Sequence, residues 1–193
     1  MGIEFELKYR ATPQLQQQIL GEIPGADQRF SMQTTYYDTP SASLSARHYT
    51  LRRRMENEVS VCTLKVPAAN SARGEWEVNC DSIESAIPML CKLGCPADLP
   101  SLTAEGVVPI CGARFTRIAR TVELPDCVVE LAIDEGVLMG GGKEIPLCEV
   151  EIELKSGSQA VCVAFAQKLA ELYRLTPEEK SKFRRALDLY RGE

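Results

Sequence analysis

The strongest constraint on the fold is a two-residue alternation of charged and apolar side chains along several strand-like segments. Near the N-terminus, Glu4, Glu6 and Lys8 alternate with Phe5 and Leu7. Because successive side chains of a strand point to opposite faces of its sheet, this segment has one ionic face and one apolar face. The same division recurs at Arg52 and Arg54, at Thr63 and Lys65, at Arg73, Glu75 and Glu77, at Glu130 and Asp134, and at Glu149, Glu151, Glu153 and Lys155.

Like charges lie two residues apart on this ionic face. Glu149, Glu151 and Glu153 repel one another, as do Arg52 and Arg54, so their placement calls for a compensating ligand. Carboxylate oxygens favour hard divalent cations such as Mg²⁺ or Mn²⁺. Arginine and lysine favour phosphate oxygens. For any one strand a plain solvent-exposed face is the alternative, but the blocks together indicate a metal-bound polyanion, most simply a polyphosphate.

The distribution of strand and helix signals predicts an α+β fold. Strands are expected near residues 2–10, 30–38, 49–56, 59–66, 73–80, 111–124, 127–137 and 146–155, and helices near 12–22, 82–94, 157–174 and 177–191. Eight mostly antiparallel strands with helices outside predict a closed eight-stranded antiparallel β-barrel. With the ionic face inward, this barrel encloses a charged tunnel, and the helices pack on its apolar outside.

Composition narrows the class of protein. The chain has 193 residues, 45% of them hydrophobic, and a formal charge of −5, which predicts a single globular domain over 1–193. No apolar run reaches the ~18 residues of a membrane span and no export signal is evident, so we expect a cytoplasmic protein. The mild acidity argues against binding to nucleic acid or an anionic membrane. Eight scattered cysteines are expected to be free thiols, mostly in the core.

The segment Glu4-Phe5-Glu6-Leu7-Lys8 resembles the Glu-x-Glu-x-Lys signature that opens CYTH domains, the triphosphate tunnel metalloenzymes. Further matching segments follow in order: Tyr36-Tyr37-Asp38-Thr39-Pro40, Leu51-Arg52-Arg53-Arg54, Thr63-Leu64-Lys65, Arg73-Gly74-Glu75-Trp76-Glu77, Phe115-Thr116-Arg117, Glu130 to Gly136, Glu149-Val150-Glu151-Ile152-Glu153-Leu154 and Ser181-Lys182. The resemblance covers nearly the whole chain and is greatest to bacterial inorganic triphosphatases. It implies the same eight-stranded tunnel and a metal-dependent triphosphatase.

The resemblance also implies roles for individual residues. The phosphate-binding basic residues would be Lys8, Arg52, Arg54, Lys65, Arg117 and Lys182. The metal-binding carboxylates would be Glu4, Glu6, Asp134, Glu149 and Glu151, with Glu75, Glu77 and Glu153 in support. One Mg²⁺ or Mn²⁺ would be held chiefly by Glu4, Glu6 and Glu151, and a second near Asp134, Glu149 and Glu151. Alternatives stay open at three positions: Glu130 for Asp134, Lys180 for Lys182, and Arg114 or Arg120 for Arg117.

The expected activity is hydrolysis of inorganic triphosphate to pyrophosphate and phosphate. A thiamine or nucleoside triphosphatase is the alternative enzyme, and it requires an aromatic or apolar rim that the sequence does not locate. A polyphosphate or nucleotide sensor without turnover is disfavoured, because a pure binder needs the basic residues more than the carboxylates. With His48 as the only histidine, we expect no histidine-rich helical partner domain, and His48 itself is expected on the surface or in a loop. The last helix is expected to present Arg184, Arg185 and Arg191 to solvent.

Overall fold

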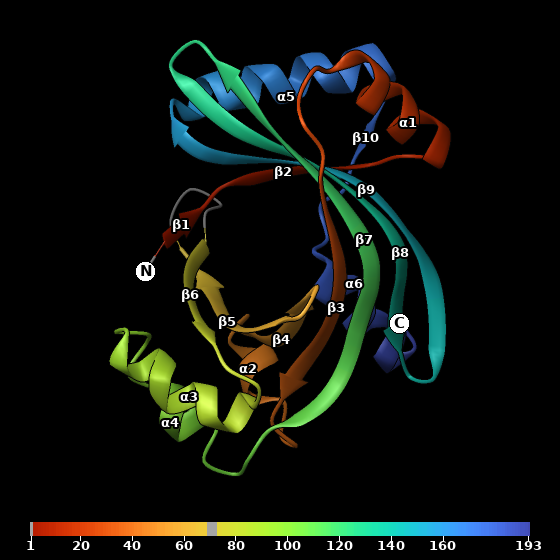
Figure 1. The fold of residues 1–193 in the computed structure, drawn as a ribbon. Coiled ribbons are helices and arrows are strands. Elements are labelled where there is room, and N and C mark those ends of the chain that lie inside the picture. Colours follow the sequence, from red (N-terminus) through yellow and green to blue (C-terminus); the bar gives the residue numbers. More distant parts are fainter. Residues whose placement is uncertain (1, 69–72) are drawn as a thin grey trace.

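The strands of this computed structural model, which describes residues 2–68 and 73–193, form one antiparallel sheet (Figure 1). Within the described ranges the strands are β1 (Gly2–Glu4), β2 (Glu6–Arg10), β3 (Gln28–Asp38), β4 (Thr50–Glu56), β5 (Val59–Pro67), β6 (Arg73–Asn79), β7 (Val108–Leu124), β8 (Cys127–Gly140), β9 (Lys143–Gly157) and β10 (Thr176–Pro177). Their order across the sheet is β1-β6-β5-β4-β3-β7-β8-β9-β2-β10. The predicted antiparallel α+β architecture is therefore confirmed.

A closed barrel of eight strands is not confirmed, because the strand order is open and the described part of the chain contributes ten strands. The first predicted strand is divided in two at Phe5. Before this residue β1 pairs with β6, and after it β2 pairs with β9; the Phe5 carbonyl accepts a hydrogen bond from Leu154 N at 2.9 Å. The N-terminal segment thus contacts two strands that lie far apart in the sheet order. Strand β10, which pairs with β2, was not predicted.

The helices are α1 (Pro13–Glu22), α2 (Ser43–Ala46), α3 (Ile83–Lys92), α4 (Leu99–Leu102), α5 (Gln159–Tyr173) and α6 (Lys182–Arg191). The short helices α2 and α4 were not predicted. Helix α6 begins later than expected, because Thr176 and Pro177 are taken up by β10 and the cap is Ser181, whose Oγ accepts a hydrogen bond from Arg184 N at 3.1 Å. None of the helices in the described ranges has the length and apolarity to cross a bilayer.

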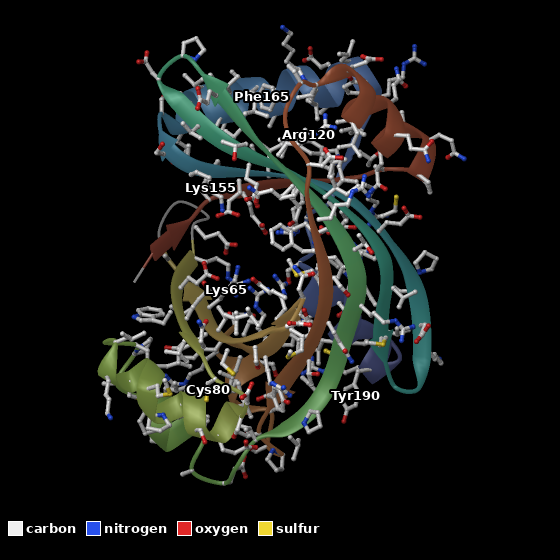
Figure 2. All side chains as sticks on the ribbon, in the orientation of Figure 1. Lys65, Cys80, Arg120, Lys155, Phe165 and Tyr190 are labelled. Atoms are coloured by element: carbon white, nitrogen blue, oxygen red, sulfur yellow. The ribbon has the colours of Figure 1, made fainter. Side chains whose placement is uncertain are left out.

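The helices cover the apolar outer face of the sheet, as predicted. Helices α1 and α5 pack on β2, β8 and β9, helices α2, α3 and α4 on β4 to β6, and α6 on β7, β8 and β9. Trp76 is buried in the apolar cluster that α2, α3 and α4 form with β4 to β6, as its place on the apolar face predicted. In Figure 2, Lys65 points into the space that the sheet curves around, whereas Cys80 lies towards α3 and Phe165 lies on α5. Burial of the outer face thus leaves the inner face to the charged side chains.

The β8–β9 hairpin holds α6 in place. Gly141 and Gly142 form its turn with φ of +58° and +75°, values that favour glycine. Gly140, directly before them, lies so close to α6 that an added Cβ would be 2.7 Å from the backbone N of Tyr190. This close approach fixes the helix whose first residue, Lys182, reaches the interior.

We expect Gly140→Ala to lower the free energy of unfolding by about 2 kcal/mol, because the added methyl group forces α6 away from the hairpin. The matched control is Gly21→Ala in α1, where no atom lies within 4 Å of the new Cβ; it should raise the free energy of unfolding by about 0.5 to 1 kcal/mol. Urea denaturation measures both. Equal stabilities of the two variants would contradict the close packing of α6 on Gly140.

Candidate functional site

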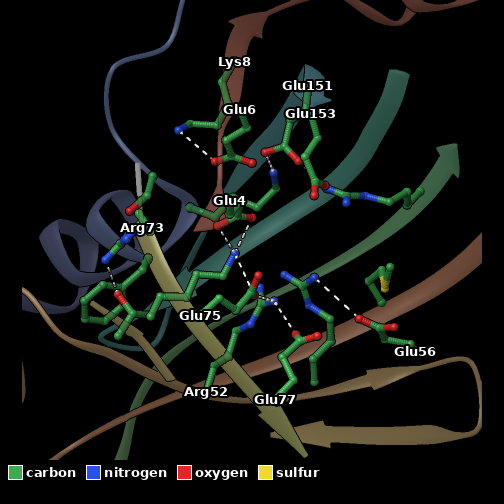
Figure 3. Close-up of a pocket in the computed structure, with 18 of the residues that line it drawn as sticks. Glu4, Glu6, Lys8, Arg52, Glu56, Arg73, Glu75, Glu77, Glu151 and Glu153 are labelled. Atoms are coloured by element: carbon green, nitrogen blue, oxygen red, sulfur yellow. Dashed lines mark hydrogen bonds and ion pairs between the residues drawn. The ribbon is translucent and has the colours of Figure 1, made fainter. Parts of the chain in front are cut away.

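The inner face of the sheet encloses a cavity of about 290 Å³, here called the main cavity (Figure 3). Among its described lining residues, eight are acidic and eight are basic. The acidic ones are Glu4, Glu6, Glu56, Glu75, Glu77, Glu130, Glu151 and Glu153, and the basic ones are Lys8, Arg52, Arg54, Lys65, Arg73, Arg117, Lys155 and Lys182. The inward alternation of the sequence therefore produces an ionic cavity in which the formal charges balance.

The sequence-predicted site residues converge on this cavity in two layers. All of the predicted phosphate-binding residues line it, and so do Glu4, Glu6 and Glu151. Asp134 and Glu149 do not line it: each is 0% exposed and lies behind the wall. They remain connected to the cavity because Lys182 contacts both of them.

The competing residues are placed differently. Glu130 lines the main cavity, whereas its rival Asp134 is buried behind the wall. Lys180 pairs with Asp188 at 2.7 Å and does not line the main cavity. Arg114 pairs with Glu144 at 3.6 Å and Arg120 with Asp27 at 2.6 Å, and neither side chain lines the main cavity. Of the basic rivals, only Lys182 and Arg117 thus reach the cavity.

Glu4 and Glu6 lie on either side of Phe5, where the N-terminal segment changes its pairing partner. Lys65 Nζ lies 2.5 Å from a carboxylate oxygen of Glu4 and 3.2 Å from Glu75. Burial raises the pKa of Glu4, but the Lys65 ammonium outweighs it and the pKa lies below its usual value. For Glu6, burial and the nearby Glu151 raise the pKa. Two carboxylates from one short segment thus face the cavity with different electrostatic surroundings.

Lys182 lies at the centre of a buried carboxylate cluster. Its Nζ is 2.8 Å from Asp134, 2.6 Å from Glu149 and 2.5 Å from Glu151. Arg117 donates to both Asp134 oxygens at 2.8 Å and also to Glu151. Burial raises the pKa of Glu151, but Lys182 and Arg117 outweigh it and the pKa falls well below its usual value. For Glu149 burial prevails, and its pKa is raised. The cluster is stable because the Lys182 ammonium and the guanidinium groups of Arg117 and Arg185 compensate the three carboxylates.

The same cluster has the chemistry of a divalent-cation site. Ligand oxygens of Asp134, Glu149 and Glu151 lie within 4.8 Å of one another, and hard oxygen donors are what Mg²⁺ and Mn²⁺ prefer. The Lys182 ammonium holds the space between them, so it competes with a cation for these oxygens. Glu4 and Glu6, by contrast, face the cavity. The oxygens of Asp134, Glu149 and Glu151 therefore fit a divalent cation, provided that the Lys182 ammonium leaves the space between them.

Three cations surround the ring of Phe115. The charged groups of Arg54, Arg117 and Lys182 lie 5.7, 5.9 and 5.4 Å from its centroid, where the negative face of the ring attracts cations. Burial and the neighbouring Arg52 lower the pKa of Arg54 to about 10. Arg52 Nε is buried without a hydrogen-bond partner among the described residues. Arg52 therefore has an N–H group that could donate a hydrogen bond to an anion, and the neighbouring cations would attract the same anion.

Sequence analysis missed several residues of the site. Glu56 lines the cavity and continues the alternation recognised at Arg52 and Arg54, so a longer reading of that pattern would have found it. Lys155 was placed on the ionic face but given no role in the site, and it also lines the cavity. The expectation that Arg185 faces solvent is wrong: its side chain is 16% exposed and bonds to Glu149, because α6 begins at Lys182, after the cap Ser181, and turns this residue inward. His48, in contrast, lies in an exposed loop as predicted.

Comparison with known proteins places this architecture in a family. The chain belongs to the CYTH domain family, whose sequence profile matches residues 2–187. It is 30% identical over 172 residues to an inorganic triphosphatase of Haemophilus influenzae, covering 86% of this chain and 49% of that protein. The chain thus spans about half the length of this relative.

Solved structures share the fold. A candidate adenylyl cyclase from Hippeastrum, described as having a dominant triphosphatase activity, is 18% identical with a TM-score of 0.67 and covers 100% of this chain and 96% of its own. The PH1819 protein of Pyrococcus horikoshii is 20% identical with a TM-score of 0.62, covering 96% of this chain and 98% of its own. At these identities the likeness establishes the fold.

Removing the Lys182 ammonium should expose its role as the counter-ion of the cluster. Without divalent cations, we expect Lys182→Met to lower the free energy of unfolding by about 3 to 5 kcal/mol, because three buried carboxylates would then face only two cations, Arg117 and Arg185. Mn²⁺ should raise the melting temperature of this variant more than that of the wild type, since the cation can take the vacated space. Thermal denaturation in chelator and in Mn²⁺ measures both effects.

The control is Lys180→Met, whose lysine is exposed and has one partner; it should change stability by about 1 kcal/mol or less. If the two variants were equally stable in chelator, or if Mn²⁺ shifted both equally, Lys182 would not be the counter-ion of the cluster.

Proposed function

We propose that this chain hydrolyses inorganic triphosphate to pyrophosphate and phosphate in the main cavity, with Mg²⁺ or Mn²⁺ as cofactor. The observation that carries the proposal is the convergence of Arg52, Arg54 and Lys182 with Glu4 and Glu6 on one ionic cavity. Membership of the CYTH domain family and the likeness to the Haemophilus influenzae triphosphatase support it.

The charge balance of the cavity supports a requirement for metal. Triphosphate brings several negative charges into a space where described acidic and basic side chains are equal in number. Because the carboxylates of the cavity already balance its basic groups, the negative charge of the triphosphate would stay uncompensated, at a large cost in a partly buried site. Divalent cations entering with the substrate would restore the balance. We propose that Glu4, Glu6 and Glu151 hold one of them, and that Asp134 and Glu149 with Glu151 hold a second once Lys182 turns towards a phosphate.

The basic residues would divide the work of binding. Arg52, Arg54 and Lys65 lie on β4 and β5, while Arg117 and Lys182 lie on β7 and α6. A triphosphate between these two groups would receive charge-assisted hydrogen bonds from both sides. Phe115 would keep Arg54, Arg117 and Lys182 together by attracting each of them to its ring. The N-terminal segment, paired with both β6 and β9, would complete the wall of the tunnel.

In the proposed reaction, the oxygen of a water molecule forms a bond to the terminal phosphorus, and the bond from that phosphorus to the bridging oxygen breaks. Pyrophosphate leaves with the electron pair, and the proton of the water passes to solvent or product. A divalent cation held by Glu4, Glu6 and Glu151 would supply Lewis acidity. The contribution of the chain's own residues is positioning and electrostatic stabilisation by groups that are already arranged.

We further propose that the chain acts as one domain in the cytoplasm. All eight cysteines are free thiols, and five of them are buried, which suits a reducing compartment.

A specific observation favours an organic triphosphate as the second candidate substrate. Phe30, Met32 and Phe183 line the main cavity, and the Phe183 ring lies 5.1 Å from that of Tyr36. This is the apolar surface that sequence analysis could not locate. It would accommodate the thiamine or nucleoside part of a larger substrate.

Phosphate release tests the proposed function and its metal site together. Purified protein is assayed with inorganic triphosphate, thiamine triphosphate, ATP and pyrophosphate, each with Mg²⁺, Mn²⁺ or chelator. We expect metal-dependent turnover with a preference for inorganic triphosphate. Glu6→Gln and Glu151→Gln should each lower kcat by about 100-fold or more, as loss of a key electrostatic group does. The control, Glu58→Gln in the exposed β4–β5 turn, should leave kcat unchanged.

Preference for an organic triphosphate would support the second candidate. Full turnover by folded Glu6→Gln and Glu151→Gln would remove these carboxylates from the mechanism. Tight triphosphate binding without turnover of any substrate would identify the chain as a sensor.

A further inference from the structure

A buried polar side chain that does not line the main cavity contacts the backbone of the carboxylate cluster. Gln16 lies on α1 and is 3% exposed. Its Nε2 donates hydrogen bonds to the carbonyl oxygens of Asp134 and Glu149, both at 3.0 Å. These two residues are partners in the antiparallel pairing of β8 with β9. One amide group therefore joins the two strands at the position from which both carboxylates enter the cluster.

The docking of α1 on the sheet does not depend on Gln16. Ile19, on the same helix, is 0% exposed and lies in the apolar cluster that α1 and α5 form with β2, β8 and β9. Arg120 of β7, labelled in Figure 2, donates to the carbonyl of Leu20 at 2.6 Å and also to that of Ile23. Apolar burial and an arginine thus hold the helix against the sheet by contacts of their own.

A polar amide in this position is costly unless its hydrogen bonds are made. Burial of an amide without a partner is unfavourable, and the neighbouring Ile19 shows that the helix packs here by its apolar side chains. The two hydrogen bonds of Gln16 compensate this cost. In return they fix the backbone of β8 relative to that of β9 at Asp134 and Glu149.

The relative position of these two residues matters for a metal ion. Ligand oxygens of Asp134, Glu149 and Glu151 lie within 4.8 Å of one another, and Mg²⁺ requires close to ideal octahedral geometry. At present the Lys182 ammonium also holds the three carboxylates together. If Lys182 turns towards a phosphate, as proposed above, that contact is lost. The hydrogen bonds of Gln16 would persist, because they involve carbonyl oxygens and leave the carboxylates free.

We propose that Gln16 is a positioning residue for this metal site. Through the two carbonyls it holds Asp134 and Glu149 at the separation that a divalent cation needs, and it does so from the helix-covered side of the sheet. The proposal rests on the proposed function, because it takes the cluster of Asp134, Glu149 and Glu151 to be a metal site. Gln16 itself touches neither the metal nor the substrate.

The test removes the hydrogen-bond donor and keeps the length of the side chain, in Gln16→Met. The full chain is titrated with Mn²⁺ in the presence of a triphosphate analogue that cannot be hydrolysed, and electron paramagnetic resonance of the free Mn²⁺ gives the Kd. Glu149→Gln, titrated alongside, identifies which bound Mn²⁺ belongs to the cluster. For Gln16→Met we expect the Kd of that ion to rise about tenfold, as loss of an outer partner of a metal ligand does.

Two control variants lie on the same helix. Gln17→Met makes the same chemical change at an exposed position and should change the Kd by less than about twofold. Ile19→Val removes a buried methyl group and lowers stability without touching either carbonyl, so it too should leave the Kd nearly unchanged. Thermal denaturation establishes that each variant is folded. If Gln16→Met does not fold, Gln16→Asn, with a shorter amide, should raise the Kd in the same direction.

An unchanged Kd in folded Gln16→Met, an equal rise in Gln17→Met or Ile19→Val, or no Mn²⁺ bound by the wild type would each overturn the proposal. Because binding is measured without turnover, a chain that binds Mn²⁺ but hydrolyses no triphosphate would refute the proposed function, while the difference in Kd still decides the role of Gln16.

Discussion

The compensation of buried charge on the inner face is the interaction on which the rest of the structure depends. Lys182 and Arg117 contact Asp134, Glu149 and Glu151 inside the sheet, and removal of either cation would leave the three buried carboxylates with too little compensating charge. These charges come from β7, β8, β9 and α6, so their compensation links three strands and a helix. The apolar outer face then follows, because the helices must cover what the charges leave outside.

This arrangement would let one surface serve both folding and the proposed hydrolysis. The ion pairs that hold the cavity together use the same oxygens and nitrogens that a metal and a phosphate would use. Ligand binding would therefore exchange one set of charge contacts for another, with little change in the total charge burial. Phe115 and Gly140 contribute by packing: the first gathers three cations around its ring, and the second fixes the helix that carries Lys182.

The sequence predicted the inner face well, because a period of two determines which face each side chain joins. It did not predict how deeply each side chain lies behind the cavity wall: Glu149 and Glu151 share a face, yet of the two only Glu151 borders the main cavity. Depth depends on the curvature of the sheet and on which helix lies across it. The position of Arg185 was missed for the same kind of reason, since the start of α6 is set by the pairing of residues 176–177 with β2. The closed barrel of eight strands is not confirmed, and the division of the first strand at Phe5 was not predicted because a change of pairing partner leaves no trace in the alternation.

The central claim is that the ionic cavity binds a metal and a polyphosphate together, and anomalous X-ray diffraction tests it most directly. Crystals would be grown with Mn²⁺ and a triphosphate analogue that cannot be hydrolysed. The account predicts an anomalous peak within ligand distance of Glu4, Glu6 and Glu151, with the analogue contacting Arg52 and Arg54. A peak only outside the main cavity, or an analogue bound without metal, would contradict the account.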